Sequence, residues 1–254
     1  MNLYNFKIVE TPQCIEVWQY EDPIVTCGSI AKDKPRKFED LSSFEKTESL
    51  KRRQTYYQNK RWEIKRIIEC NYDNRSSFVT LTYREMMENI DESNYEFKKF
   101  IQRLNSYFGK RIKYIATWEL QKRGSIHYHV VFFDFQYIKA KTLEKIWQHG
   151  FVKINMIRVD HPYQIGLYVS KYFAKDIDVK NRKKKAYFKS RNLRRPTINT
   201  FYFPEKNFDM TFDDKSRVYE KKYIATRKNG DHWIDISVRY SIFAKPDTAN
   251  EQET

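Results

Sequence analysis

The stretch Tyr114-Ile-Ala-Thr-Trp-Glu-Leu-Gln-Lys-Arg-Gly-Ser-Ile-His-Tyr-His-Val-Val-Phe-Phe133 decides the fold, because it contains two strand-like runs around a short polar loop. Its last four residues form an apolar run that indicates a buried strand. The loop is Lys122-Arg-Gly124, and a three-residue hairpin loop places its third residue in the left-handed region, where glycine fits best. The stretch therefore predicts an antiparallel hairpin centred on Arg123.

The register of this hairpin brings three metal-binding side chains together. Centring the turn on Arg123 pairs Glu119 with His127 and Thr117 with His129, and directly opposed residues have Cβ atoms about 5 Å apart on one face. Histidines two residues apart on a strand share that face. One carboxylate and two imidazoles with open coordination positions suit Mn²⁺ or Mg²⁺ acting on a phosphate. The alternative is that these histidines are ordinary polar residues on the exposed face of a sheet.

A second pattern lies in Gly166-Leu-Tyr-Val-Ser-Lys-Tyr-Phe-Ala-Lys-Asp176. Tyr168 and Tyr172 are four residues apart, which places them on one helical face. Each is followed three residues later by a lysine, Lys171 or Lys175. Positive charge beside a phenol stabilises the phenolate and makes the oxygen a better nucleophile. The alternative is an amphipathic helix with core aromatics and a solvated lysine face.

Together the two segments resemble the HUH endonuclease family of rolling-circle replication initiators, and in particular those of bacterial plasmids and small single-stranded DNA phages. A third segment, Phe78-Val-Thr-Leu-Thr-Tyr83, looks like the first motif of that family, an apolar strand ending in threonine. Phe151-Val-Lys-Ile-Asn155 and Ser190-Arg-Asn-Leu-Arg-Arg-Pro196 look like stretches of the bacterial plasmid members. The resemblance covers roughly residues 78–196.

The resemblance implies a metal-dependent enzyme that nicks and joins single-stranded DNA. It implies a metal held by Glu119, His127 and His129, and a nucleophile that is either Tyr168 or Tyr172. Attack would leave a 5′-phosphotyrosine and a free 3′-hydroxyl. The implied partners are single-stranded DNA at a replication origin and the host helicase and DNA polymerase. A relaxase or single-strand transposase of the same family remains an alternative, as does a non-catalytic module that binds single-stranded nucleic acid.

The charge of the chain favours a polyanionic partner. Its 254 residues include 48 Lys and Arg against 33 Asp and Glu, a net charge of +15. The excess is densest over residues 171–195, where aromatic residues suited to stacking on unpaired bases are interleaved. A solvated basic tail is the alternative. The expected DNA-contacting residues are Lys122, Arg123, Arg182, Lys183, Lys184, Lys185, Arg191, Arg194 and Arg195.

Other features narrow the class of protein. The three scattered cysteines, Cys14, Cys27 and Cys70, favour a reducing compartment. The N-terminus lacks the apolar core of a signal peptide, and no run approaches the length of a membrane span. We therefore expect a cytoplasmic protein with no membrane partner. The phosphate-binding pattern Gly-x-x-x-x-Gly-Lys-Ser/Thr does not occur, so we expect no nucleotide cofactor.

The expected fold class is α+β, with an antiparallel sheet of about five strands in βαββαβ order, helices on one face, and extensions at both ends. We expect strands at 77–83, 112–135 (the hairpin) and 151–159, and helices at 44–70, 93–108, 142–149 and from about residue 162, with Gly109 and Gly150 as helix stops. Hairpins are expected at 6–20 and 218–240. The expected segments are 1–40 (hairpin and polar linker), 41–72 (basic helix), 73–178 (HUH endonuclease domain) and 179–254 (basic extension ending in a hairpin).

Overall fold

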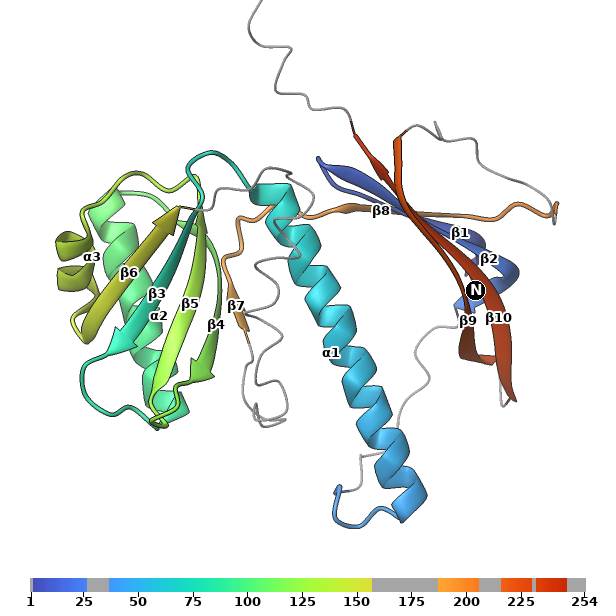
Figure 1. Cartoon of the computed structure of the whole chain (residues 1–254), viewed down its shortest axis with the longest axis horizontal. Helices are drawn as coiled ribbons and strands as arrows, with labels where there is room; N and C mark the ends of the chain where they lie inside the picture. The colour runs from blue at the N-terminus through green and yellow to red at the C-terminus, as the bar shows by residue number, and fades with distance from the viewer. Residues whose placement is uncertain (1, 27–36, 157–186, 206–215, 230–231, 246–254) are drawn as a thin grey trace, which may run out of the picture. The chain divides into compact units, whose positions relative to one another are not determined.

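The computed structural model describes residues 2–26, 37–156, 187–205, 216–229 and 232–245. The chain divides into two compact units (Figure 1). Residues 51–195 form one, here called the central unit, and residues 1–50 with 196–254 form the other, here called the terminal unit. The expected tyrosine helix and the basic run 182–185 lie outside the described residues.

The central unit is built on a five-stranded antiparallel sheet with the strand order β6-β3-β5-β4-β7. The expected α+β class with an antiparallel sheet is therefore confirmed. Strand β7 was not expected, because the sequence beyond residue 178 shows only a basic, irregular pattern. The strands are β3 (Ser77–Tyr83), β4 (Lys113–Leu120), β5 (Ile126–Phe133), β6 (Gly150–Met156) and β7 (Tyr187–Lys189).

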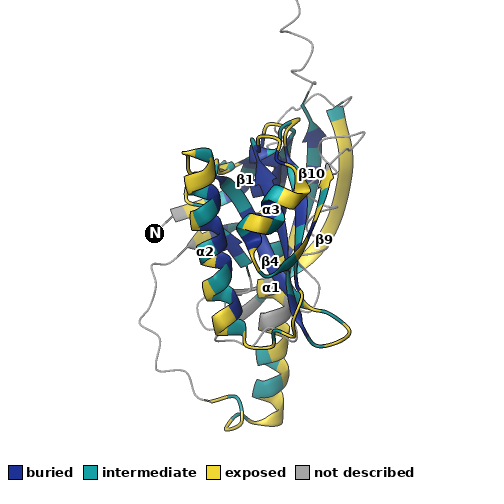
Figure 2. Cartoon of the chain, turned by 90° about the vertical axis from the view of Figure 1, so that its left-hand side faces the viewer, coloured by how far each residue is buried: buried dark blue, intermediate teal, exposed yellow. Residues whose placement is uncertain are grey.

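Two helices, α2 (Ile90–Phe108) and α3 (Ala140–Trp147), pack on one face of this sheet (Figure 1). Helix α2 begins three residues before the expected start, because the Asn89 side chain accepts hydrogen bonds from the first backbone N–H groups. It ends as expected at Gly109, which has φ 64°. Figure 2 shows its buried stripe, which includes Phe97, Phe100 and Leu104.

Gly150 has a different role from the one expected. Helix α3 ends at Trp147, and Gln148 takes the left-handed position with φ 71°. Gly150 instead begins β6, where a Cβ atom would lie 2.4 Å from the carbonyl oxygen of Thr82 and 2.5 Å from the backbone nitrogen of Arg84. Only glycine permits this approach of β6 to the end of β3.

Helix α1 (Ser43–Asn71) corrects the expectation that all helices lie on one face. Within the central unit, its residues Ile64, Ile67 and Ile68 form a buried cluster with side chains of the opposite sheet face, among them Ile115 and Val131. The last turns of α1 therefore cover part of the face that was expected to be open. The hairpin end of that face carries the polar side chains described below.

The terminal unit is a second five-stranded antiparallel sheet with the order β8-β1-β2-β10-β9. Both expected hairpins are present, and β2 pairs with β10 so that Trp18 lies opposite Tyr240. Sequence patterns placed these two hairpins in separate segments. The strands are β1 (Asn2–Glu10), β2 (Cys14–Thr26), β8 (Thr197–Phe201), β9 (Arg217–Asn229) and β10 (His232–Ala244). Within the described residues, no helix is long and apolar enough to cross a membrane.

Candidate metal centre and nucleic-acid groove

The β4–β5 hairpin has the register that the sequence predicts. Glu119 pairs with His127, and Thr117 pairs with His129. Gly124 has φ 89°, and its backbone N–H donates to the carbonyl of Gln121 at 2.8 Å. A tight loop with glycine in the left-handed region therefore fixes which side chains share a face.

Glu119, His127 and His129, here called the triad, converge on one point. Glu119 Oε1 lies 2.8 Å from Nε2 of His127 and 2.9 Å from Nε2 of His129. The potential ligand atoms all lie within 4.8 Å of one another. Two imidazole nitrogens and a carboxylate oxygen in this arrangement have the chemistry of a divalent cation site.

Side chains behind the triad orient both imidazoles. The Nδ1 atom of His127 lies 3.1 Å from Nε2 of Gln121, and the Nδ1 atom of His129 lies 3.3 Å from the hydroxyl of Thr80. Such partners hold a metal-binding imidazole in position. The sequence analysis assigned no role to Gln121 or Thr80. Thr80 belongs to the strand motif of residues 78–83, but its neighbour His129 is known only from the β3–β5 pairing.

The Glu119 carboxylate is held in its charged form. Hydrogen bonds from His127 and His129 lower its pKa far below the usual range, and they outweigh the opposing effect of burial. The second carboxylate oxygen, Oε2, is buried and has no hydrogen-bond partner among the described residues. A buried oxygen without a partner is unfavourable, so an ionised Glu119 fits a site that binds a cation.

A groove with a volume of about 760 Å³ opens beside the triad. Glu119 and His127 line it, together with the cationic Arg84 and Lys122 and the aromatic Phe151. All of these residues belong to the central unit. The groove therefore combines metal ligands, positive charge and one aromatic ring, which are the side chains that a nucleic-acid strand requires.

Arg123 also lines the groove, and it anchors the hairpin loop. Its Nη2 donates to the carbonyl of Tyr83 at 2.7 Å, and its Nε donates to Gln121 Oε1 at 3.0 Å. Of the other expected DNA-contacting residues, Arg191, Arg194 and Arg195 are exposed beyond β7. Tyr168, Lys171, Tyr172, Lys175 and the run Arg182, Lys183, Lys184 and Lys185 lie outside the described residues.

The positive charge of the chain is confined to the central unit. Residues 51–195 hold 33 of the 48 Lys and Arg residues but only 14 of the 33 Asp and Glu residues, which gives a net charge of +19. The terminal unit holds the remaining 15 basic and 19 acidic residues, so its net charge is −4. Attraction to a polyanion therefore originates in the unit that contains the triad.

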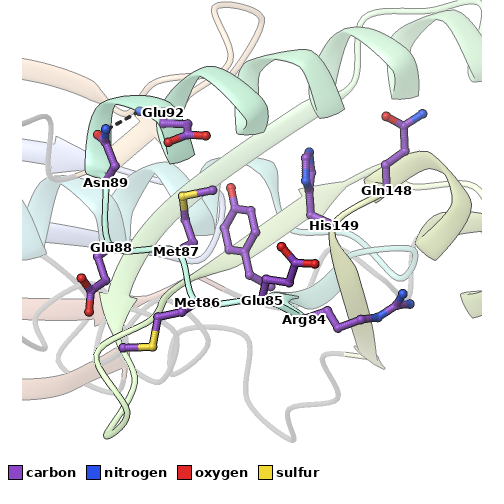
Figure 3. Close-up of a pocket in the computed structure, with 10 residues that line it drawn as sticks. Arg84, Glu85, Met86, Met87, Glu88, Asn89, Glu92, Gln148 and His149 are labelled. Atoms are coloured by element: carbon purple, nitrogen blue, oxygen red, sulfur yellow. Dashed lines mark hydrogen bonds between the residues drawn. The ribbon is translucent and has the colours of Figure 1, made fainter.

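A second pocket, of about 610 Å³, has the opposite electrostatic character (Figure 3). It lies between the segment that follows β3 and the segment that follows α3, and Glu85, Glu88 and Glu92 line it together with Arg84 and His149. Three carboxylates repel phosphate groups. The groove beside the triad is consequently the better site for DNA.

Comparison with known families gives one match. The family model of the replication-associated protein ORF2 matches residues 76–177. Over this span the chain is similar to replication-associated proteins. The span contains β3 to β6, and therefore the whole triad, and it continues into the tyrosine segment. Comparisons with curated proteins and with solved structures return no match.

Proposed function

We propose that this protein is a rolling-circle replication initiator that nicks and rejoins single-stranded DNA. The observation that carries the proposal is the convergence of Glu119, His127 and His129 on one point beside a cation-lined groove. Similarity to replication-associated proteins over the same residues supports it. Without that similarity, the triad alone would indicate only a divalent cation site.

The triad would hold Mn²⁺ or Mg²⁺, which when bound supplies polarisation of the scissile phosphate. Gln121 and Thr80 would keep the two imidazoles oriented toward that position. Arg84 and Lys122, at the groove, would attract the backbone phosphates on either side of the reacting one.

The proposed nucleophile is the phenol oxygen of Tyr168 or Tyr172. It forms a new bond to phosphorus while the bond between phosphorus and the 3′-oxygen breaks, and the phenol proton leaves as the 3′-hydroxyl forms. Lys171 and Lys175 would stabilise the developing phenolate. The second tyrosine would attack a later junction and release a circle. The 3′-hydroxyl would prime the host DNA polymerase, and a host helicase would separate the strands.

The test is cleavage of oligonucleotides that tile the DNA flanking the gene, with the covalent adduct trapped and located by mass spectrometry. We expect cleavage with Mn²⁺ or Mg²⁺ and an adduct on Tyr168 or Tyr172. The His129→Ala variant should bind DNA but not cleave it, and the Tyr168→Phe, Tyr172→Phe double variant should form no adduct. Undiminished cleavage in EDTA, or an adduct on another tyrosine, would refute the proposal. Binding without any cleavage would favour a non-catalytic module.

A further inference from the structure

Phe151 is a large apolar side chain that remains 63% exposed beside the triad. It lies on β6, the edge strand of the central sheet. Phe151 pairs with Thr82 of β3, Thr82 pairs with His127 of β5, and His127 pairs with Glu119 of β4. Paired residues face the same side of a sheet. The ring therefore belongs to one row of side chains that ends at two of the three triad residues.

Lys153 continues this surface along the same edge strand. It pairs with Thr80, which pairs with His129, so it lies in the next row across the same face. The intervening Val152 points to the opposite face and is buried in the core under α2 and α3. Lys153 is exposed, and no ion pair joins it to another described residue. The edge strand thus presents a ring and then a cation on the face of the triad.

An exposed aromatic ring is not by itself unusual on a protein surface. Phe151 differs because it lines the same groove as Glu119 and His127, rather than an open surface. Its strand lies two strand spacings from that of His127, about 10 Å. A nucleotide that adjoins a phosphate at the triad reaches this distance. The flat face of a base is the part of DNA that an aromatic ring contacts without regard to sequence.

We propose that Phe151 is a base-stacking residue for the nucleotide next to the reacting phosphate, and that Lys153 contacts a neighbouring backbone phosphate. The single strand would then run from the triad toward β6 across the sheet. This inference rests on the proposed function, because it names the substrate contacts of the same groove. It adds a specific binding direction and two residues that the sequence analysis did not assign.

The test is equilibrium binding of a fluorescein-labelled oligothymidylate, measured by anisotropy in EDTA over a range of salt concentrations. Stacking contributes about 1–3 kcal/mol per base, so Phe151→Ala should weaken binding roughly 5- to 150-fold. The slope of log K against log[salt] should stay unchanged, because no charge is removed. Phe151→Trp should bind as tightly as the wild type. Phe151→Leu, which keeps apolar bulk, should behave as Phe151→Ala does.

Two further variants provide the controls. Lys153→Gln should flatten the salt slope by about 0.7, the contribution of one phosphate contact in single-stranded DNA. Tyr137→Ala removes a ring that is 88% exposed and does not line the groove, and it should bind as the wild type does.

The outcomes separate this inference from the proposed function. Wild-type affinity in both Phe151→Ala and Phe151→Leu would overturn the stacking role even if the protein cleaves DNA. A changed salt slope in Phe151→Ala would overturn it as well. A protein that shows the expected binding pattern but never cleaves DNA would retain the stacking role and lose the proposed function. Absence of any binding by the wild type would overturn both.

Discussion

At the scale of single residues, the triad depends on side chains that do not themselves contact the proposed metal position. Gln121 and Thr80 each place one polar atom against the rear nitrogen of an imidazole. Without these contacts both rings can rotate about their side-chain bonds. The energy of rotation is small, but a cation site requires all its ligand atoms at fixed positions.

We therefore predict that Gln121→Ala raises the Mn²⁺ dissociation constant by about 10- to 100-fold, which is the usual effect of removing such a partner. Thr80→Val should act in the same direction through His129. Calorimetric titration with Mn²⁺ measures the change. Lys122→Gln, in the same loop but with no contact to an imidazole, is the matched control. Equal dissociation constants for all these proteins would contradict the prediction.

Tyr83 gives a prediction for alkaline pH. Burial raises its pKa to about 12, above the value near 10 of an exposed tyrosine. A group whose pKa is higher in the folded state contributes stability that is fully present below pH 10 and is lost between pH 10 and 12. Tyr83→Phe removes this titration, so its free energy of unfolding should fall less over that window, by about 1.4 kcal/mol per unit of pKa difference. Urea unfolding at pH 8 and pH 11.5 measures it, and identical pH dependence of both proteins would contradict it.

At the scale of elements, local features were predictable and long-range contacts were not. The β4–β5 register follows from a three-residue loop with Gly124 at its end, so all the information lies within about twenty residues of sequence. The placement of Thr80 beside His129 depends on which strands become neighbours, and periodicity does not encode that. The same reason explains why the packing of Ile64 and Ile67 against the sheet was not foreseen. Gly150 was assigned to the wrong element because a glycine after a helix usually ends it.

Gly150 yields a prediction for the β3–β6 contact. In Gly150→Ala the new methyl group meets backbone atoms of β3 that cannot rotate away. The free energy of unfolding should fall by about 1–3 kcal/mol or more from the forced shift. Gly109→Ala is the matched control, because nothing lies within 4 Å of its added Cβ and it bears only the strain of a left-handed backbone, about 1–2 kcal/mol. Chemical denaturation of both variants gives the comparison, and an equal or smaller loss in Gly150→Ala would contradict this account.

At the scale of the whole molecule, the two units have opposite net charges. Sequence composition revealed the overall excess of +15. It did not reveal that the terminal unit is acidic, because the two ends of the chain were not known to form one sheet. Nucleic-acid affinity should consequently depend on charges of the central unit alone.

We predict that charge-neutral replacements of Arg191, Arg194 and Arg195 flatten the salt dependence of single-stranded DNA binding, by about 0.7 in slope for each phosphate that is no longer neutralised. Neutral replacements across residues 182–185 should do the same. Replacing Lys221 and Lys222, which are exposed on β9 of the terminal unit, should leave the slope unchanged. An equal effect of the β9 lysines would show that both units contact DNA.

The pairing of β2 with β10 has a consequence for the newborn chain on the ribosome. The β1–β2 hairpin is made first, but the open edge of β2 has no partner until residues 232–244 have been translated. At 5–20 residues per second, that interval lasts roughly ten to forty seconds. An isolated hairpin is marginally stable in water, and a free strand edge invites pairing with other chains. The central unit, made of consecutive residues, has no such delay. A stop codon before residue 232 would make the exposure of β2 permanent.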